Sequence, residues 1–137
     1  MSNSNYKFTY LTVRGFGEVS RLILHHAGVK FEDVRFDRDE FVKNHKKDFP
    51  AGQVPLLEVD GHRISQSGAI VRFLARRFGL EGADEFEKTR ADEIYAFYYD
   101  RMREHREYHL FRLQNPGKDS VSSGRGIVGS SAVRGCS

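Results

Sequence analysis

The dipeptide Asp60-Gly61 lies between two short runs that favour β-strands, residues 55–59 and residues 62–65. Asp-Gly between such runs is the strongest short-range signal for a β-hairpin, because the tight turn needs positive φ angles that these two residues tolerate. Part of the sheet must therefore be antiparallel. A helical pattern over residues 67–78 follows the hairpin directly and ends at Gly79. Its inward-facing apolar residues are Ile70, Val71, Phe73, Leu74 and Phe78.

The sequence before the hairpin alternates between strand and helix signals. Residues 6–12 and residues 31–36 are rich in aromatic and β-favouring side chains, so each predicts a strand. Residues 18–27 lie between them and predict a helix that ends before Gly28, while residues 38–48 are charged and only weakly helical. The residues at helical spacing in the first helix are Val19, Leu22, Ile23, His26 and Ala27. The predicted order is β-α-β-α-β-β-α, an α/β fold with a mixed sheet and helices on its faces.

A long helix is predicted after this domain. Residues 85–109 contain neither Gly nor Pro, and a helix of that length measures about 38 Å. Steps of four along it give Phe86, Arg90, Ile94, Tyr98 and Met102, a stripe that is apolar apart from Arg90. This stripe needs a partner, and nothing later in the sequence offers one.

The end of the chain has a different composition. Gly and Ser occupy 11 of the 27 positions in residues 111–137, with neither a helical nor a strand period, so we expect a disordered tail. The chain is thus predicted to consist of a folded domain over residues 1–79, a linker and long helix over residues 80–110, and this tail.

Charge and composition narrow the classes of function. The net charge is +3, and the tail alone accounts for it, which leaves 18 basic and 18 acidic side chains in residues 1–110. A neutral folded body argues against a nucleic-acid-binding protein, whose basic patch lies on a folded face. No apolar run reaches the roughly 18 residues of a membrane span, and the N-terminus lacks a secretory signal. The single cysteine, Cys136, allows no internal disulfide, so a cytoplasmic location without membrane binding is expected.

Tyr10 is a candidate catalytic residue. It lies on the first predicted strand and is followed by Arg14-Gly15 and the start of a helix. A tyrosine hydroxyl can donate a hydrogen bond to a developing anion, and a helix N-terminus adds positive potential. An aromatic residue on a buried strand is nevertheless more often part of the core.

Two further pairs of residues could contact a ligand. A cis peptide bond between Val54 and Pro55 would expose the Val54 backbone to an extended peptide, although a trans proline at a strand edge is the ordinary expectation. Gln66-Ser67 opens a helix. Ser67 fits a simple N-cap, and the same helix end could also bind a carboxylate.

These motifs together resemble the sigma class of the glutathione transferase family. The resemblance rests on residues 6–10 with Arg14-Gly15, on residues 52–61, and on Gln66-Ser67 with the apolar residues that follow, and it covers residues 6 to about 108. It implies a thioredoxin-like first domain, followed by the first helix of an all-helical second domain that is truncated here. It also implies glutathione as co-substrate, no metal or other cofactor, a small hydrophobic electrophile, and a homodimer in an intact relative.

The resemblance implies a role for each matching residue. Tyr10 matches the tyrosine that activates the thiol, and Arg14 is counted among the glutathione-binding residues. Val54 matches the residue whose backbone pairs with the cysteinyl part of glutathione before a cis-proline at Pro55. The residues implied for the γ-glutamyl end are Gln66 and Ser67.

The resemblance places other residues at the remaining parts of glutathione. Gln53 lies near the glycyl end, and Phe41 stands where the family commonly has tryptophan. Either His45 or Lys46 matches a lysine that binds the glycyl carboxylate. Asp100 matches an aspartate that reaches the glutamyl amine bound to the neighbouring subunit.

The implied function is conjugation of glutathione to electrophiles. Tyr10 would stabilise the thiolate by a hydrogen bond, whereas Phe16 stands where several sigma-class members have an arginine beside the thiol. One alternative is a glutathione-binding or structural, crystallin-like relative with little turnover, because the helical domain is truncated. Another is a fragment that docks on full-length partners through its long helix.

Overall fold

The structure is a computed structural model and describes residues 3–117. The chain divides after Met102 into two compact units. In chain order the elements are β1 (Tyr6–Leu11), a 3₁₀ turn (Gly15–Gly17), α1 (Glu18–His26), β2 (Phe31–Phe36), α2 (Arg38–Glu40), a π-type turn (Phe41–His45), 3₁₀ turns (Lys46–Asp48 and Pro50–Gly52), β3 (Leu56–Val59), β4 (His62–Ser65), α3 (Ser67–Arg77) and α4 (Glu85–Gln114).

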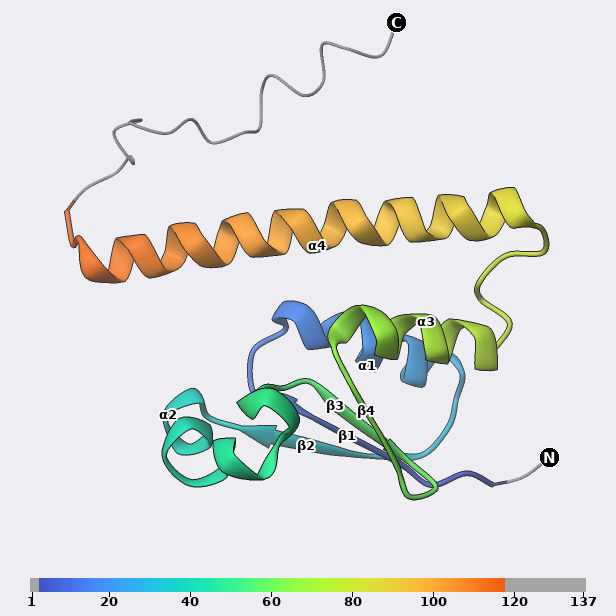
Figure 1. The fold of residues 1–137 in the computed structure, drawn as a ribbon, viewed down its shortest axis with the longest axis horizontal. Coiled ribbons are helices and arrows are strands. Elements are labelled where there is room, and N and C mark those ends of the chain that lie inside the picture. The colour runs from blue at the N-terminus through green and yellow to red at the C-terminus, as the bar shows by residue number, and fades with distance from the viewer. Residues whose placement is uncertain (1–2, 118–137) are drawn as a thin grey trace, which may run out of the picture. The chain divides into compact units, whose positions relative to one another are not determined.

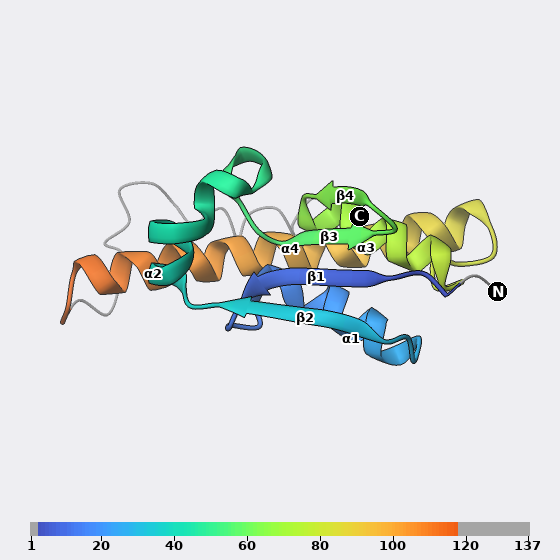
Figure 2. The ribbon, with the colours of Figure 1, turned by 90° about the horizontal axis from the view of Figure 1, so that it is seen from below.

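The four strands form one mixed sheet in the order β2-β1-β3-β4 (Figure 2). β1 runs parallel to β2 and antiparallel to β3, and β3 pairs with β4 in the predicted hairpin. Asp60 and Gly61 have φ angles of 49° and 84°, so both turn residues are left-handed, as this type of turn requires. The predicted α/β, thioredoxin-like order of elements is confirmed.

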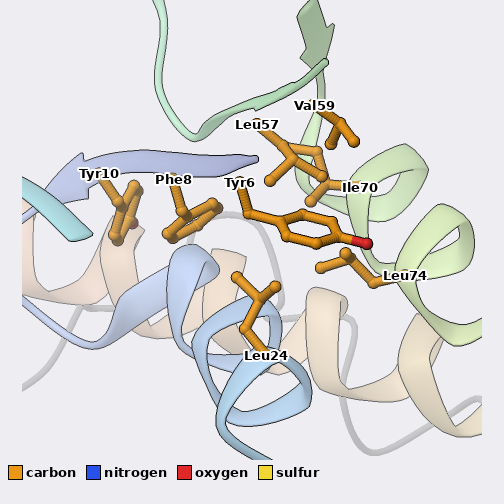
Figure 3. Close-up of a cluster of buried hydrophobic side chains, with 8 residues drawn as sticks. All are labelled: Tyr6, Phe8, Tyr10, Leu24, Leu57, Val59, Ile70 and Leu74. Carbon is orange, nitrogen blue, oxygen red and sulfur yellow. The ribbon is translucent and has the colours of Figure 1, made fainter. Parts of the chain in front are cut away.

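The core lies between the sheet and two helices, α1 and α3, which cover the same face of the sheet (Figure 1). Tyr6, Phe8 and Tyr10 alternate along β1, so all three side chains point to this face (Figure 3). They are 7%, 0% and 6% exposed, and burying an apolar side chain of this size stabilises the fold by about 1.5–3 kcal/mol. The buried side chains that complete the cluster are Leu24, Leu57, Val59, Ile70 and Leu74.

The helix α1 forms where predicted, but it buries a different face. Leu22 is 57% exposed, whereas Arg21 is only 2% exposed. The Arg21 guanidinium donates hydrogen bonds to the carbonyl oxygens of Leu11 (3.1 Å) and Val13 (3.2 Å) and to Asp33 Oδ1 (3.1 Å). A charged side chain is therefore buried because backbone and carboxylate acceptors satisfy it.

Several boundaries differ from those expected. α4 continues to Gln114, so residues 111–114 are helical rather than part of a disordered tail. Residues 118–137, the rest of that predicted tail, lie outside the described residues. The weakly helical stretch at 38–48 forms a chain of short turns of three types. Between residues 3 and 117, no helix is both long enough and apolar enough to cross a membrane.

Candidate functional site

The strand register brings the predicted site residues to one end of the sheet. Leu11 pairs with Phe36, the last residue of the parallel strand β2, so both strands end there. Thr9 pairs with Leu56 at the start of β3, and Leu56 pairs with Ser65 at the end of β4. Several predicted site residues lie at these ends of the strands or within a few residues of them: Tyr10, Arg14, Phe41, Val54, Pro55, Gln66 and Ser67.

Tyr10 is enclosed by the loop that follows its strand. The backbone N–H of Phe16 donates a 3.0 Å hydrogen bond to the Tyr10 hydroxyl oxygen. A Cβ at Gly17 would lie 2.3 Å from the Tyr10 ring, and one at Gly15 would lie 2.7 Å from its hydroxyl, so only glycine fits at either position. The Arg21 guanidinium lies 5.5 Å from the ring centre. The phenol is therefore held in one orientation with its oxygen at the loop.

The long helix α4 also reaches this loop. The Tyr98 hydroxyl donates a 2.7 Å hydrogen bond to the Gly15 carbonyl oxygen, and the Tyr99 ring packs on Phe16 with 5.1 Å between ring centres. Burial raises the pKa of Tyr98, and the neighbouring Tyr95 and Tyr10 raise it further. The sequence analysis placed Tyr98 in an apolar stripe that has no partner. This prediction is wrong for Tyr98, whose hydroxyl binds the Gly15 carbonyl. No pattern in the sequence indicates this contact, because its acceptor is a backbone carbonyl of a distant loop.

Val54 enters the same core as Tyr10. Its side chain is half-buried against the hydrophobic cluster that contains Tyr10, and Pro55 is buried. The Val54-Pro55 peptide bond is cis, which confirms the geometry implied by the family resemblance. Val54 therefore packs against the same hydrophobic cluster to which Tyr10 belongs.

The entrance to α3 differs from the N-cap expected at Ser67. Gln66 occupies the cap position, with φ 72° and ψ 120°, and Ser67 is already the first helical residue. A non-glycine residue with positive φ costs energy and is common at ligand-binding sites. The Gln66 carbonyl accepts the first helical hydrogen bond, from Ile70 N–H at 3.0 Å. Gln66 is exposed, whereas Ser67 is 7% exposed.

Tyr95 of α4 lies behind Ser67. Burial raises the pKa of Tyr95, and the Ser67 side chain and the Arg72 charge act in the opposite direction. The two hydroxyls do not form a hydrogen bond of ordinary geometry, since the Tyr95 oxygen has no such partner among the described residues. Arg72 lies over the Tyr95 ring at 5.9 Å and pairs with Asp92 at 3.0 Å, which fastens α3 to α4.

The residues predicted for the glycyl end lie on the turns after β2. Phe41 is 6% exposed and packs on Phe49, with 5.3 Å between the ring centres. His45 stacks on Phe36 at 4.2 Å. Lys46 is exposed, and its side chain lies against Gly52, where an added Cβ would be 3.0 Å from Lys46 Cε.

The other predicted residues are exposed. Arg14 lies on the loop after β1, Gln53 precedes Val54, and Asp100 lies on α4 two residues beyond Tyr98. Over residues 3–117, no group of three or more His, Cys, Asp and Glu side chains is arranged to hold a metal ion. The groups at this end of the sheet include the hydroxyls of Tyr10 and Ser67 and the backbone amide of Phe16.

The sequence of this chain is similar to those of known proteins. The profile of the glutathione S-transferase N-terminal domain matches residues 6–76. Glutathione S-transferase 1 of Ascaris suum is 50% identical over 99 residues, which are 72% of this chain and 48% of the relative. Glutathione S-transferase 3 of Caenorhabditis elegans is 39% identical over 130 residues, 95% of this chain and 62% of the relative. That second match extends beyond residue 110, where the family resemblance was expected to stop.

Solved structures give the same result. A Nu-class glutathione transferase from Haemonchus contortus superposes with a TM-score of 0.65 at 44% identity, covering 71% of this chain and 47% of that one. The chain thus spans about half to three-fifths of the length of the proteins it resembles. Because the domain profile covers more than half of its residues, this chain belongs to the glutathione S-transferase family.

Proposed function

We propose that this chain binds glutathione at the end of the sheet where β1, β3 and β4 meet, and that Tyr10 activates its thiol. The observation that carries the proposal is the hydrogen bond from Phe16 N–H to the Tyr10 oxygen. Accepting this hydrogen bond uses a lone pair of the phenol oxygen and not its proton. The Tyr10 hydroxyl can therefore donate that proton in a hydrogen bond to a sulfur. The backbone donor also stabilises the negative charge that then grows on the oxygen.

Thiol chemistry explains why such a donor matters. A free thiol has a pKa near 8.5, so only a few per cent is thiolate at neutral pH. Each unit by which the pKa falls corresponds to about 1.36 kcal/mol of preferential stabilisation of the thiolate. The thiolate attacks an electrophilic carbon and displaces its leaving group, or adds to an activated double bond.

The rest of glutathione has proposed partners along the same edge. The Val54 backbone pairs with the cysteinyl part, and the Gln66 and Ser67 groups bind the γ-glutamyl carboxylate. Of the two candidates for the glycyl carboxylate, Lys46 is favoured because the His45 ring is stacked on Phe36. The proposed site also includes Arg14, Phe41 and Gln53. Asp100 would reach the glutamyl amine of the glutathione bound to the neighbouring subunit.

Assignment to the sigma class, a cytoplasmic location and a homodimer remain parts of this proposal. Turnover of an electrophile also belongs to this proposal, because the chain spans only part of its relatives' length. The alternative is a glutathione-binding protein with little turnover. It is supported by the large apolar residues that α4 leaves exposed, Phe86 (82%), Ile94 (65%) and Phe97 (65%).

Two measurements on residues 1–137 test the proposal. Calorimetry with glutathione should give saturable binding, and conjugation of a small aryl halide should depend on the Tyr10 hydroxyl. Tyr108→Phe is the matched control, because it removes a hydroxyl from a half-exposed tyrosine outside the site. Absence of glutathione binding would refute the site, whereas binding without conjugation would support the alternative.

A further inference from the structure

One peptide group links two tyrosines. The carbonyl oxygen of Gly15 accepts the hydrogen bond from Tyr98 at 2.7 Å, and the N–H of the same peptide group, that of Phe16, donates to Tyr10 at 3.0 Å. The connection therefore runs from the Tyr98 hydroxyl through a single amide to the Tyr10 oxygen. Tyr98 comes from α4 and Tyr10 from β1, 88 positions apart in the chain.

An amide transmits the effect of one hydrogen bond to the other. Resonance shifts electron density from nitrogen to oxygen, so a donor at the oxygen makes the N–H more positive. Hydrogen bonds joined in this way strengthen one another by about 10–30% each. The Tyr98 hydroxyl should thus strengthen the bond from Phe16 N–H to Tyr10, most of all when Tyr10 shares its proton with a thiolate and its oxygen becomes more negative.

The surroundings favour this transmission. Tyr10 is 6% exposed and Tyr98 is partly buried, so little water screens the two bonds. The Arg21 guanidinium from α1 lies over the Tyr10 ring, and Glu18 of α1 and Tyr95 of α4 are the other ionisable groups that act on Tyr98. Arg21 already supplies a fixed positive charge, and Tyr98 adds a neutral, directional donor.

We propose that Tyr98 is a positioning residue for thiol activation, which acts on Tyr10 through the Gly15-Phe16 peptide. This inference rests on the proposed role of Tyr10. It assigns to α4 a part in the chemistry at the first strand. Loss of the Tyr98 hydroxyl alone would weaken the thiolate without any change in a group that is proposed to touch glutathione.

The test compares Tyr98→Phe with Tyr99→Phe in the full chain. Both changes remove one hydroxyl from the same part of α4, and Tyr99 contacts the loop through its ring. Thiolate absorbance of bound glutathione is followed against pH. Tyr98→Phe should move the midpoint to higher pH, with roughly a twofold to fivefold smaller thiolate fraction at a given pH. Tyr99→Phe should leave it in place.

A second titration needs no glutathione. The tyrosinate absorbance of Tyr10, obtained as the difference from Tyr10→Phe, should shift to higher pH in the Tyr98→Phe protein. Replacement of Tyr98 by 3-fluorotyrosine, whose hydroxyl is a stronger donor while it is protonated, should shift the thiol midpoint to lower pH. The affinity for S-methylglutathione, which has no ionisable thiol, should be equal in all variants.

The outcomes separate the two proposals. If Tyr98→Phe leaves both midpoints where they are, or if it lowers the affinity for S-methylglutathione as much as that for glutathione, the positioning role is wrong. If Tyr10→Phe itself does not move the thiol midpoint, the proposed function fails. The Tyr10 titration would still decide whether Tyr98 acts on Tyr10.

Discussion

The buried guanidinium of Arg21 donates a 3.1 Å hydrogen bond from Nε to Asp33, which joins α1 to β2. The same side chain also binds the carbonyl oxygens of Leu11 and Val13 at the end of β1. One residue therefore fixes the crossover helix against both parallel strands, immediately below the loop that encloses Tyr10.

Removal of this side chain should destabilise the fold. Arg21→Met keeps much of the apolar volume but removes the donor to two carbonyls and to one oxygen of the Asp33 carboxylate, so we expect a loss of at least about 2 kcal/mol in the free energy of unfolding. Urea denaturation measures it. Arg76→Met, at an exposed position on α3, is the control and should change stability by less than about 0.5 kcal/mol. Equal midpoints for the two variants would contradict this assignment.

Asp33 should make stability depend on pH in the acid range. Its partial burial alone would raise its pKa, but hydrogen bonds from Arg35 and Arg21, together with their charges, hold the pKa below its usual value. A carboxylate with a lowered folded-state pKa contributes stability above its unfolded pKa of about 3.9, and this contribution is lost as pH falls through the folded-state value. Asp33→Asn should therefore flatten the acid side of a plot of urea midpoint against pH, while Asp39→Asn should not.

Tyr10→Phe should leave the fold intact and abolish thiol activation. The ring stays in the core, and only the hydroxyl is lost. The apparent pKa of bound glutathione should rise towards the value of the free thiol, about 8.5. The pH dependence of thiolate absorbance measures it, with Tyr108→Phe as control. An unchanged thiol pKa in the Tyr10 variant would exclude the proposed role.

Loss of the polar groups at the start of α3 should weaken glutathione binding. Each hydrogen bond to a charged group contributes about 1.5–3 kcal/mol, so Gln66→Ala with Ser67→Ala should reduce the affinity by several kcal/mol at most. Calorimetry with a glutathione analogue that lacks the glutamyl carboxylate is the control, since both proteins should bind that analogue equally. If the double variant binds glutathione as tightly as the original chain, the carboxylate site lies elsewhere.

The exposed apolar side chains of α4 should promote self-association. Replacement of Phe86, Ile94 and Phe97 by Ser should lower the sedimentation coefficient at high protein concentration, because the apolar patch is removed. Val42→Ser, at a 54% exposed position on the turns after β2, should have no such effect. A monomeric starting protein would contradict the expectation.

The geometry of α4 explains which part of the sequence prediction failed. Each residue of a helix turns by about 100°, so a step of four residues drifts by about 40°. A stripe read in steps of four from Phe86 therefore turns through about 160° by Met102. Phe86, Ile94 and Phe97 fall within about 80° of one another and are exposed, whereas Tyr98 has turned far enough to bind the loop after β1.

The order of elements was predictable because each has a local cause, such as the turn at Asp60-Gly61. The burial of Arg21 was not, because its acceptors come from the end of β1 and from β2 and exist only in the folded chain. The same limit applies to the site. Motifs pointed to Tyr10 and Gln66 as candidates, but the hydrogen bond of Tyr98 to the Tyr10 loop goes to a backbone carbonyl, which carries no sequence signal.

Gln66 is the whole connection between β4 and α3, and its left-handed backbone sets the direction in which the helix leaves the sheet. A connection of one residue cannot absorb a change in length. An added or lost residue there would rotate α3, or it would shift the register of β4 and turn the side chains of that strand to the opposite face of the sheet. The turns over residues 38–52 carry no strand and can change length without this penalty. In chimaeras between relatives, we therefore expect the turns over residues 38–52 to be exchangeable as a separate segment, whereas Gln66 must be transferred together with the hairpin and α3.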